Sequence, residues 1–123
     1  MKKELREQVW NKYDKKCAYC GSVIEYKDMQ VDHLTPQCLS HFYTGINSFE
    51  NLMPSCRRCN HYKNSYILED FRELLKTLHE RVEKNYINKV AIDYEIVRIF
   101  PFDGNFYFER INPRFGNKQI KKG

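Results

Sequence analysis

Hydrophobic positions near the start of the chain follow a helical period. Leu5, Val9, Trp10 and Tyr13 recur at helical spacing, and Lys and Glu side chains lie between them. Residues that recur in this way fall on one face of a helix, with the polar residues on the other face. Residues 3–13 are therefore predicted to form an amphipathic helix.

A longer apolar stripe lies in the second half of the chain, where Ser65 to Phe100 contains neither Gly nor Pro. The stripe comprises Ile67, Leu68, Phe71, Leu74, Leu75, Leu78, Val82 and Tyr86. It predicts one long helix. Residues 89–100 fit a helix or a strand, and the helix is preferred. The sequence FYFERI at 106–111 follows a turn at 103–105 and is predicted to be a strand.

The segment between these two regions predicts shorter elements. Residues 22–34 read as a hairpin that ends in a strand at 29–34, and Pro36 stops that strand. Residues 35–50 are loop-like. A short helix is expected near 57–64.

Composition is that of a single soluble globular domain. The chain has 123 residues, of which 41% are hydrophobic and 30% charged, and this excludes a wholly disordered chain. No apolar run approaches the roughly 20 residues that cross a bilayer, so no membrane partner is expected. The charged start, with no apolar stretch after it, predicts no secretory signal and a cytoplasmic location.

The net charge of +5 arises at one end of the chain. Acidic and basic residues cancel up to residue 109, and no acid follows Glu109. The five unbalanced charges are Arg110, Arg114, Lys118, Lys121 and Lys122. This tail is either a solvated end or a supporting contact to phosphates.

Four of the five cysteines form two pairs of identical spacing, Cys17 with Cys20 and Cys56 with Cys59. Two C-x-x-C turns supply the four sulfurs of a tetrahedral Zn²⁺ site. Such a site has no open position, so the zinc is predicted to be structural. Cys38 is expected to be a small hydrophobe or a partly exposed thiol. Thiol redox chemistry at the pairs is the alternative, and it requires them to be free of zinc.

Three residues in and after the insert between the pairs carry groups suited to chemistry. The carboxylate of Asp32 can ligate a hard divalent cation, and the imidazole of His33 can take a proton from water near neutral pH. Asn60 directly follows Cys59, so the second C-x-x-C turn (here called a knuckle, like the first) sets its position. Its amide oxygen can be a second ligand for the same hard cation. Neighbours on a strand point to opposite faces, so Asp32 and His33 can share a site only where the strand ends, twists or bulges.

Together these pieces resemble the HNH endonucleases of the ββα-metal (His-Me finger) group, in the C-x-x-C-flanked type. The matching pieces are CAYCG at 17–21, VDHLTP at 31–36, NLMPSC at 51–56 and CNHYK at 59–63. The three letters of the HNH motif correspond to His33, Asn51 and Asn60. The third is Asn here rather than His, so the chain is similar to an HNN variant.

The resemblance implies a role for each matched residue. His33 would be the general base, and Asp32 would bind a catalytic Mg²⁺ or Mn²⁺. Asn51 would brace the loop and orient the base. Asn60 would be the second metal ligand, with His61 as the runner-up.

The expected fold class is α+β, a small zinc-stabilised ββα-metal core with a long C-terminal helical extension and a short terminal strand. The core is expected at 1–64, with a helical extension and basic tail at 65–123 packed on it as one structural unit. Side chains predicted to hold flanking phosphates are Arg57, Arg58 and Lys63.

The function implied is metal-dependent hydrolysis of DNA phosphodiester bonds, most simply in double-stranded DNA, by nicking or by a double-strand cut. A monomer and a homodimer both fit. The alternative is a non-catalytic zinc module that binds nucleic acid or a protein partner.

Overall fold

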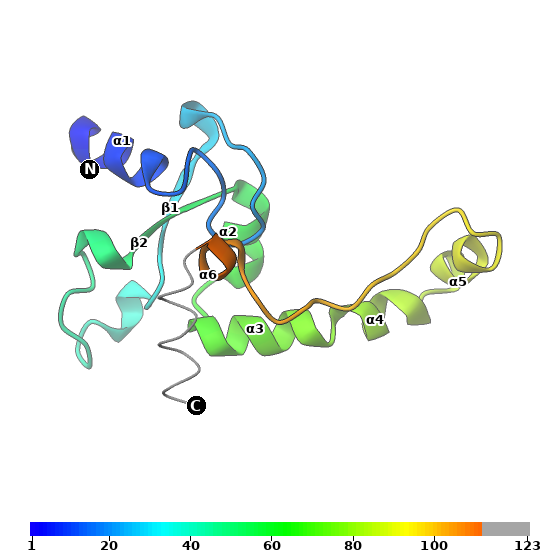
Figure 1. Ribbon diagram of the computed structural model, residues 1–123. Helices are drawn as coiled ribbons and strands as arrows, with labels where there is room; N and C mark the ends of the chain where they lie inside the picture. Colours follow the sequence, from blue (N-terminus) through cyan, green and yellow to red (C-terminus); the bar gives the residue numbers. More distant parts are fainter. Residues whose placement is uncertain (112–123) are drawn as a thin grey trace. The chain divides into compact units, whose positions relative to one another are not determined.

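The computed structural model describes residues 1–111. It divides into two compact units (Figure 1). The first comprises Met1–Leu68 together with the segment that begins at Phe106, and the second comprises Glu69–Asn105. Both cysteine pairs and the Asp32–His33 dipeptide lie in the first unit.

A two-stranded antiparallel sheet forms the centre of the first unit. Strand β1 (Gln30–His33) pairs with β2 (Leu52–Ser55), which lies on the far side of the insert. The pairs in register are Gln30 with Ser55, Val31 with Pro54, Asp32 with Met53 and His33 with Leu52. The strand predicted at 29–34 is thus present, but the hairpin at 22–34 is wrong. Residue 23 forms only an isolated bridge with Lys16.

Helix α1 (Lys3–Asn11) packs against β2 and closes the small core, as the apolar period predicted. The core residues are Val9, Ile24, Met29 and Leu52. At the rim, Trp10 donates its indole N–H to the Ile24 carbonyl at 2.9 Å, and Arg6 donates to the Met29 carbonyl at 2.9 Å. These bonds tie α1 to the chain that leads into β1.

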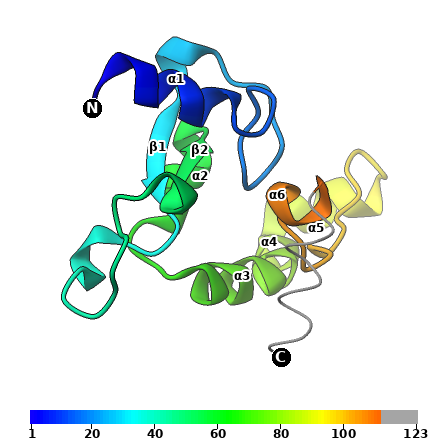
Figure 2. The ribbon, with the colours of Figure 1, turned by 60° about the vertical axis from the view of Figure 1, so that its left-hand side comes forward.

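Helix α2 (Arg57–Lys63) follows the second cysteine knuckle and contacts β1 (Figure 2). Cys56 is its N-cap, and its sulfur accepts a bond from the Cys59 N–H at 3.4 Å. Three short 3-10 turns complete the connections: η1 (Tyr26–Asp28), η2 (Gln37–Leu39) and η3 (Phe49–Asn51). The order β1, β2, α2 confirms the expected ββα core.

The strand predicted at 106–111 is wrong, because this segment forms helix α6 (Tyr107–Ile111). A helix leaves its first N–H groups without internal partners, and here the knuckle accepts two of them. The Tyr107 N–H bonds to the Tyr19 carbonyl at 3.0 Å, and the Phe108 N–H bonds to the Ala18 carbonyl at 2.8 Å. The Glu109 carboxylate also accepts the Phe106 N–H at 2.9 Å.

The second unit is helical, as predicted, but its helix is interrupted. Three helices succeed one another: α3 (Leu68–Lys76), α4 (Leu78–Lys84) and α5 (Tyr86–Asp93). The breaks fall at Thr77 and at Asn85. Asn85 has an extended backbone, and its side-chain Oδ1 caps α5 by accepting a hydrogen bond from the Ile87 N–H at 3.0 Å. An Asn side chain that caps the next helix competes with continuation of the previous one.

The preference for a helix at 89–100 is right only as far as Asp93, where α5 ends. Glu95 has a φ of 58°, a left-handed conformation that does not continue a helix. Residues 97–100 have no regular structure. The helix expected at 89–100 is thus present only in its first part, up to Asp93.

Two further expectations concern the end of the chain. Packing of the 65–123 extension on the core as one structural unit stays a prediction. The basic tail, apart from Arg110, lies outside the described residues. In residues 1–111, no helix has the length and apolar character needed to cross a membrane.

Candidate functional site

The four paired cysteines converge, although 35 residues separate the pairs. The sulfurs of Cys17, Cys20, Cys56 and Cys59 all lie within 4.8 Å of one another. Turns at the two knuckles bring this about. In the first, the Gly21 N–H bonds back to the Cys17 carbonyl at 2.9 Å. In the second, Cys56 caps α2.

The cluster has the dimensions of a zinc site. A Zn–S bond is about 2.3 Å, so the sulfurs of a tetrahedral site lie about 3.8 Å apart, and the Cys20 and Cys56 sulfurs are 3.8 Å apart. Hydrogen bonding to Cys17 and Cys59 lowers the pKa of the Cys20 thiol, and hydrogen bonding to Cys17 and Cys20 raises that of Cys59. The sulfurs compete for the same protons, and a bound divalent cation removes that competition. Four cysteine sulfurs at these distances could hold a structural metal such as zinc.

Asp32 lies inside the protein, in contact with two donors. Its Oδ2 accepts a bond from the Tyr19 hydroxyl at 2.5 Å and pairs with the Lys63 ammonium at 3.0 Å. Burial, and then the charge of Asp32, raise the pKa of Tyr19 well above its ordinary value. Tyr19 therefore keeps its proton at neutral pH and donates it to the carboxylate. Within residues 1–111, the other oxygen, Oδ1, makes no hydrogen bond or ion pair.

His33 is the last residue of β1 and is partly exposed. Its Nε2 lies 3.0 Å from the Asn47 Oδ1. With that amide oxygen accepting, Nε2 carries the proton, and Nδ1 keeps the lone pair that a base needs. Because the strand ends at His33, the condition under which adjacent residues serve one site is met for Asp32 and His33.

Asn51 ties the insert to the end of the sheet. Its amide N–H groups donate to the carbonyls of Thr35 (3.0 Å) and Ile46 (2.7 Å), and its Oδ1 accepts the Thr35 N–H at 2.8 Å. Its own carbonyl accepts the Leu34 N–H at 2.9 Å. Asn51 therefore holds both Thr35 and Ile46, so it connects the two ends of the segment between them to the end of the sheet. Its role in orienting a base stays a prediction.

Helix α2 carries the remaining candidates. Asn60 is half-buried, and its side-chain amide has no partner within the described chain. Arg57 and Arg58 are exposed on the first turn, and His61 is exposed one residue after Asn60. In residues 1–111 neither arginine has an acidic partner, so both guanidinium groups face solvent.

The prediction that Lys63 holds a phosphate requires correction. The side chain is fully buried, and its ammonium bonds to Asp32 and to the His33 carbonyl, at 3.0 and 3.1 Å. A buried cation needs an opposite charge and hydrogen-bond acceptors, and these two residues supply them. Lys63 thus links α2 to the end of β1 from within.

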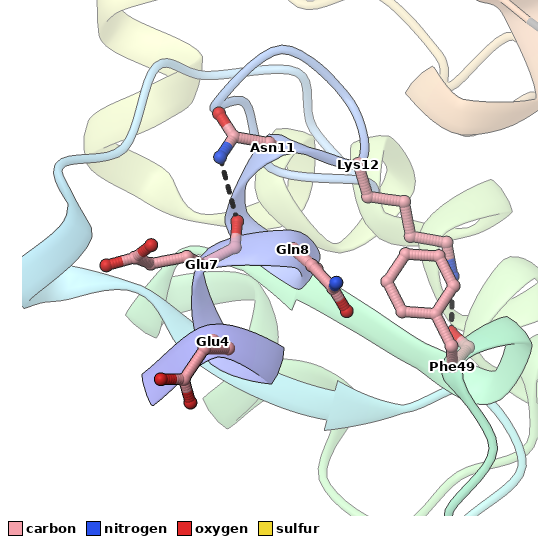
Figure 3. Close-up of a pocket in the computed structure, with 6 residues that line it drawn as sticks. All are labelled: Glu4, Glu7, Gln8, Asn11, Lys12 and Phe49. Carbon is pink, nitrogen blue, oxygen red and sulfur yellow. Dashed lines mark hydrogen bonds between the residues drawn. The ribbon is translucent and has the colours of Figure 1, made fainter. Parts of the chain in front are cut away.

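Among the surface hollows of the described residues, one lies away from this chemistry and one borders it. The larger, of about 670 Å³, lies along α1 and is lined by Glu4, Glu7, Gln8, Asn11, Lys12 and Phe49 (Figure 3). Two carboxylates on its wall disfavour a phosphate there. The smaller, of about 250 Å³, is formed by residues of the insert, among them Thr35, Ile46 and Asn51.

The geometry places a four-sulfur cluster, a buried carboxylate and a partly exposed imidazole on one ββα scaffold. Residues 17–65 match the family model of the HNH endonucleases. This HNH segment begins at the first zinc-knuckle cysteine and ends just after α2. It contains every candidate site residue named above.

A curated relative covers the same length of chain. The chain is 39% identical over 49 residues to the CRISPR-associated endonuclease Cas9 of Corynebacterium diphtheriae (strain ATCC 700971 / NCTC 13129 / Biotype gravis). The match includes 40% of this chain but only 4% of the length of that Cas9. No solved structure matches the chain at a significant level.

Sequence reasoning missed two residues of the site. No motif assigns a role to Tyr19, although the residue is 3% exposed and its hydroxyl contacts Asp32. Asn47 lies in a polar loop that has no periodic signal. The signal that could have indicated Tyr19 is an aromatic residue inside a C-x-x-C turn, because large aromatic side chains are mostly buried in small cores. No pattern along the chain indicates Asn47.

Proposed function

We propose that the HNH segment hydrolyses phosphodiester bonds in DNA, with His33 as general base and one divalent cation held by Asp32 and Asn60. The observation that carries the proposal is the contact between His33 and Asn47. The Asn47 amide oxygen lies 3.0 Å from Nε2 of a partly exposed ring, and an imidazole that donates its Nε2 proton to that oxygen keeps a lone pair on Nδ1. A positioned imidazole that removes a proton from attacking water accelerates hydrolysis by about 10²–10⁴-fold.

The oxygen atoms of Asp32 and Asn60 fit a hard cation such as Mg²⁺ or Mn²⁺. Oδ1 of Asp32 and the amide of Asn60 have no partner within the part of the chain that is described, while Oδ2 is held in place by Tyr19 and Lys63. α2 contacts β1, so the elements that carry the two ligands are neighbours. When bound, the cation would neutralise charge that develops on the phosphate.

The exposed arginines of α2 support a nucleic-acid substrate. Arg57 and Arg58 lie three and two residues before Asn60, respectively. Guanidinium groups bind phosphate oxygens in a bidentate manner and so hold the backbone beside a scissile bond. The likeness of the segment to part of a Cas9 endonuclease points to the same substrate class. We propose double-stranded DNA as that substrate, cut by nicking or through both strands.

The test is cleavage of supercoiled plasmid with Mg²⁺ or Mn²⁺ by the zinc-loaded chain and by His33→Ala. We expect the parent to nick the plasmid and the variant to be at least about 10²-fold slower, which is the low end of the contribution of a general base. His41→Ala is the matched control, because His41 is exposed and makes no hydrogen bond within the described residues. It should cleave at the parental rate.

Full-strength nicking by His33→Ala would remove His33 from this role. A parent chain that binds DNA but cleaves none, with either cation, would instead favour a non-catalytic zinc module. Measured melting temperatures of the three proteins should agree within a few degrees, so that a change in rate is not a change in folding.

A further inference from the structure

We infer that Tyr19 is a positioning residue that couples the cysteine knuckle to the metal-binding carboxylate of Asp32. The inference rests on the proposed function. The hydroxyl of Tyr19 donates to the Asp32 Oδ2 at 2.5 Å, which is the shorter of the two contacts to that oxygen. Tyr19 lies between two zinc-ligand candidates, Cys17 and Cys20, so one turn of the chain touches both proposed metal sites.

The backbone of Tyr19 is held from several directions. The neighbouring Ala18 N–H bonds to the Pro54 carbonyl on β2 at 2.8 Å, and the Tyr19 carbonyl accepts the Tyr107 N–H at 3.0 Å. The knuckle is thereby attached both to the sheet and to α6. The position of the Tyr19 Cα is set by the fold and by the cysteine cluster, not by contact with Asp32.

The ring of Tyr19 is fixed as well. It packs edge-on against Phe106, with centroids 5.7 Å apart and planes at 82°, and against Phe108, at 6.3 Å and 89°. Edge-to-face contacts of this kind are favourable arrangements of aromatic rings. A ring held on two sides presents its hydroxyl at one place, and the carboxylate must turn to meet it.

The consequence for Asp32 is a fixed choice of oxygen. Tyr19 and Lys63 both contact Oδ2, so the free lone pairs of the carboxylate are mainly on Oδ1. Without the hydroxyl, the carboxylate is restrained by Lys63 alone and can rotate. Loss of a group that orients a metal ligand typically costs 10–100-fold in metal affinity or activity.

The experiment compares Tyr19→Phe with Tyr66→Phe in the full, zinc-loaded chain. Both changes remove one hydroxyl, but Tyr66 is 47% exposed and makes no side-chain hydrogen bond in the described chain. Binding of Mn²⁺ is followed by the electron paramagnetic resonance signal of the free ion, without substrate. The Mn²⁺ concentration that gives half-maximal nicking is measured alongside, and Asp32→Asn serves as the reference without a carboxylate.

We expect Tyr19→Phe to keep one zinc per chain and to bind Mn²⁺ at least about 10-fold more weakly. The half-maximal concentration should rise by the same factor, while the rate at saturating Mn²⁺ returns toward that of the parent. A purely structural role would lower the number of binding sites and the maximal rate, and leave both midpoints in place. Unchanged or tighter Mn²⁺ binding would overturn the inference.

If Tyr19→Phe loses its zinc, the inference is tested on the parent chain instead. Labelling tyrosine at Cζ with ¹³C reports hydrogen bonding of each hydroxyl, and Mg²⁺ should shift the Tyr19 resonance but not that of Tyr66. An unmoved Tyr19 resonance at saturating Mg²⁺ overturns the inference. A parent that neither binds Mn²⁺ nor nicks DNA overturns the proposed function as well, whereas parental binding with an unaffected Tyr19→Phe overturns this inference alone.

Discussion

At the scale of single residues, the candidate site contains buried charged side chains that each have an ion-pair or hydrogen-bond partner. Lys63 shows this most clearly, because a lysine with no exposed surface has both an ion pair and a carbonyl as partners. Asp32 in turn has two donors on one oxygen. Each group is tolerable inside the protein only because the other is present.

Removal of the buried cation should therefore be costly. Lys63→Met leaves Asp32 without its counter-ion, and breaking a buried pair in this way typically costs about 3–5 kcal/mol. Lys76→Met is the matched control, since Lys76 pairs with Glu73 on the surface at 3.4 Å, and such pairs contribute about 0–1 kcal/mol. Urea unfolding of the zinc-loaded proteins measures both, and a loss below about 1 kcal/mol for Lys63→Met would contradict the prediction.

At the scale of elements, the fold is an assembly of short pieces joined by side chain to backbone bonds. α1 is attached to β2 and to η3 by Lys12, which follows its last turn (Figure 3). The ammonium donates to the carbonyls of Phe49 (2.9 Å), Glu50 (3.3 Å) and Leu52 (2.8 Å). Burial lowers the pKa of Lys12, and the charge of Glu50 partly opposes that effect.

Lys12→Met should loosen α1 from the sheet. Hydrogen bonds from a charged donor contribute about 1.5–3 kcal/mol, so we expect the free energy of unfolding to fall by about 1–3 kcal/mol. Lys3→Met changes the same side chain at an exposed position on α1 and should leave stability within about 0.5 kcal/mol. Thermal unfolding followed by circular dichroism distinguishes the two, and equal melting temperatures would count against the anchoring role.

At the scale of the whole molecule, the first unit is small and its apolar core is modest. A unit of this size usually needs a metal or disulfides in addition to its core. A metal held by the cysteine cluster would meet that need, because the cluster joins the turn at Cys17 and Cys20 to the turn before α2. The aromatic rings of Tyr19, Phe106 and Phe108 pack together next to the first of these turns.

Loss of one ligand should unfold the first unit, since binding of a structural zinc contributes directly to folding. We expect Cys59→Ser to bind less than one zinc per chain and to lose its cooperative melting transition. Cys38→Ser is the control, because Cys38 is exposed and outside the cluster. It should keep both properties of the parent. Elemental analysis and calorimetry measure them, and an unchanged melting temperature for Cys59→Ser would refute a structural metal.

The elements that depend on local spacing could be predicted from the sequence. α1 follows from an apolar period, α2 from a knuckle that caps it, and the cysteine cluster from two C-x-x-C steps. The roles proposed for His33 and Asp32 came from motif letters that stand close together. The two helices need no distant partner to be predicted, and the cysteine pairs, although 35 residues apart, identify each other by their identical spacing.

The other elements depend on contacts between segments far apart in the chain, and no hydrophobic periodicity in the sequence indicates those contacts. β1 pairs with residues 52–55 rather than with its own upstream segment, and 107–111 is helical because the knuckle offers carbonyls to its first N–H groups.

Most candidate site residues are readable from the chain alone, because C-x-x-C spacing, motif order and apolar period are properties of the sequence; Tyr19 and Asn47 are the exceptions. Which side chains face solvent and which contact one another follows from the fold: Lys63 is buried, Tyr19 hydrogen-bonds to Asp32, and Asn47 lies 3.0 Å from a ring nitrogen of His33. The reason is physical. Burial and hydrogen bonding depend on what the fold brings within about 3 Å, and that is settled by packing between segments far apart in the chain.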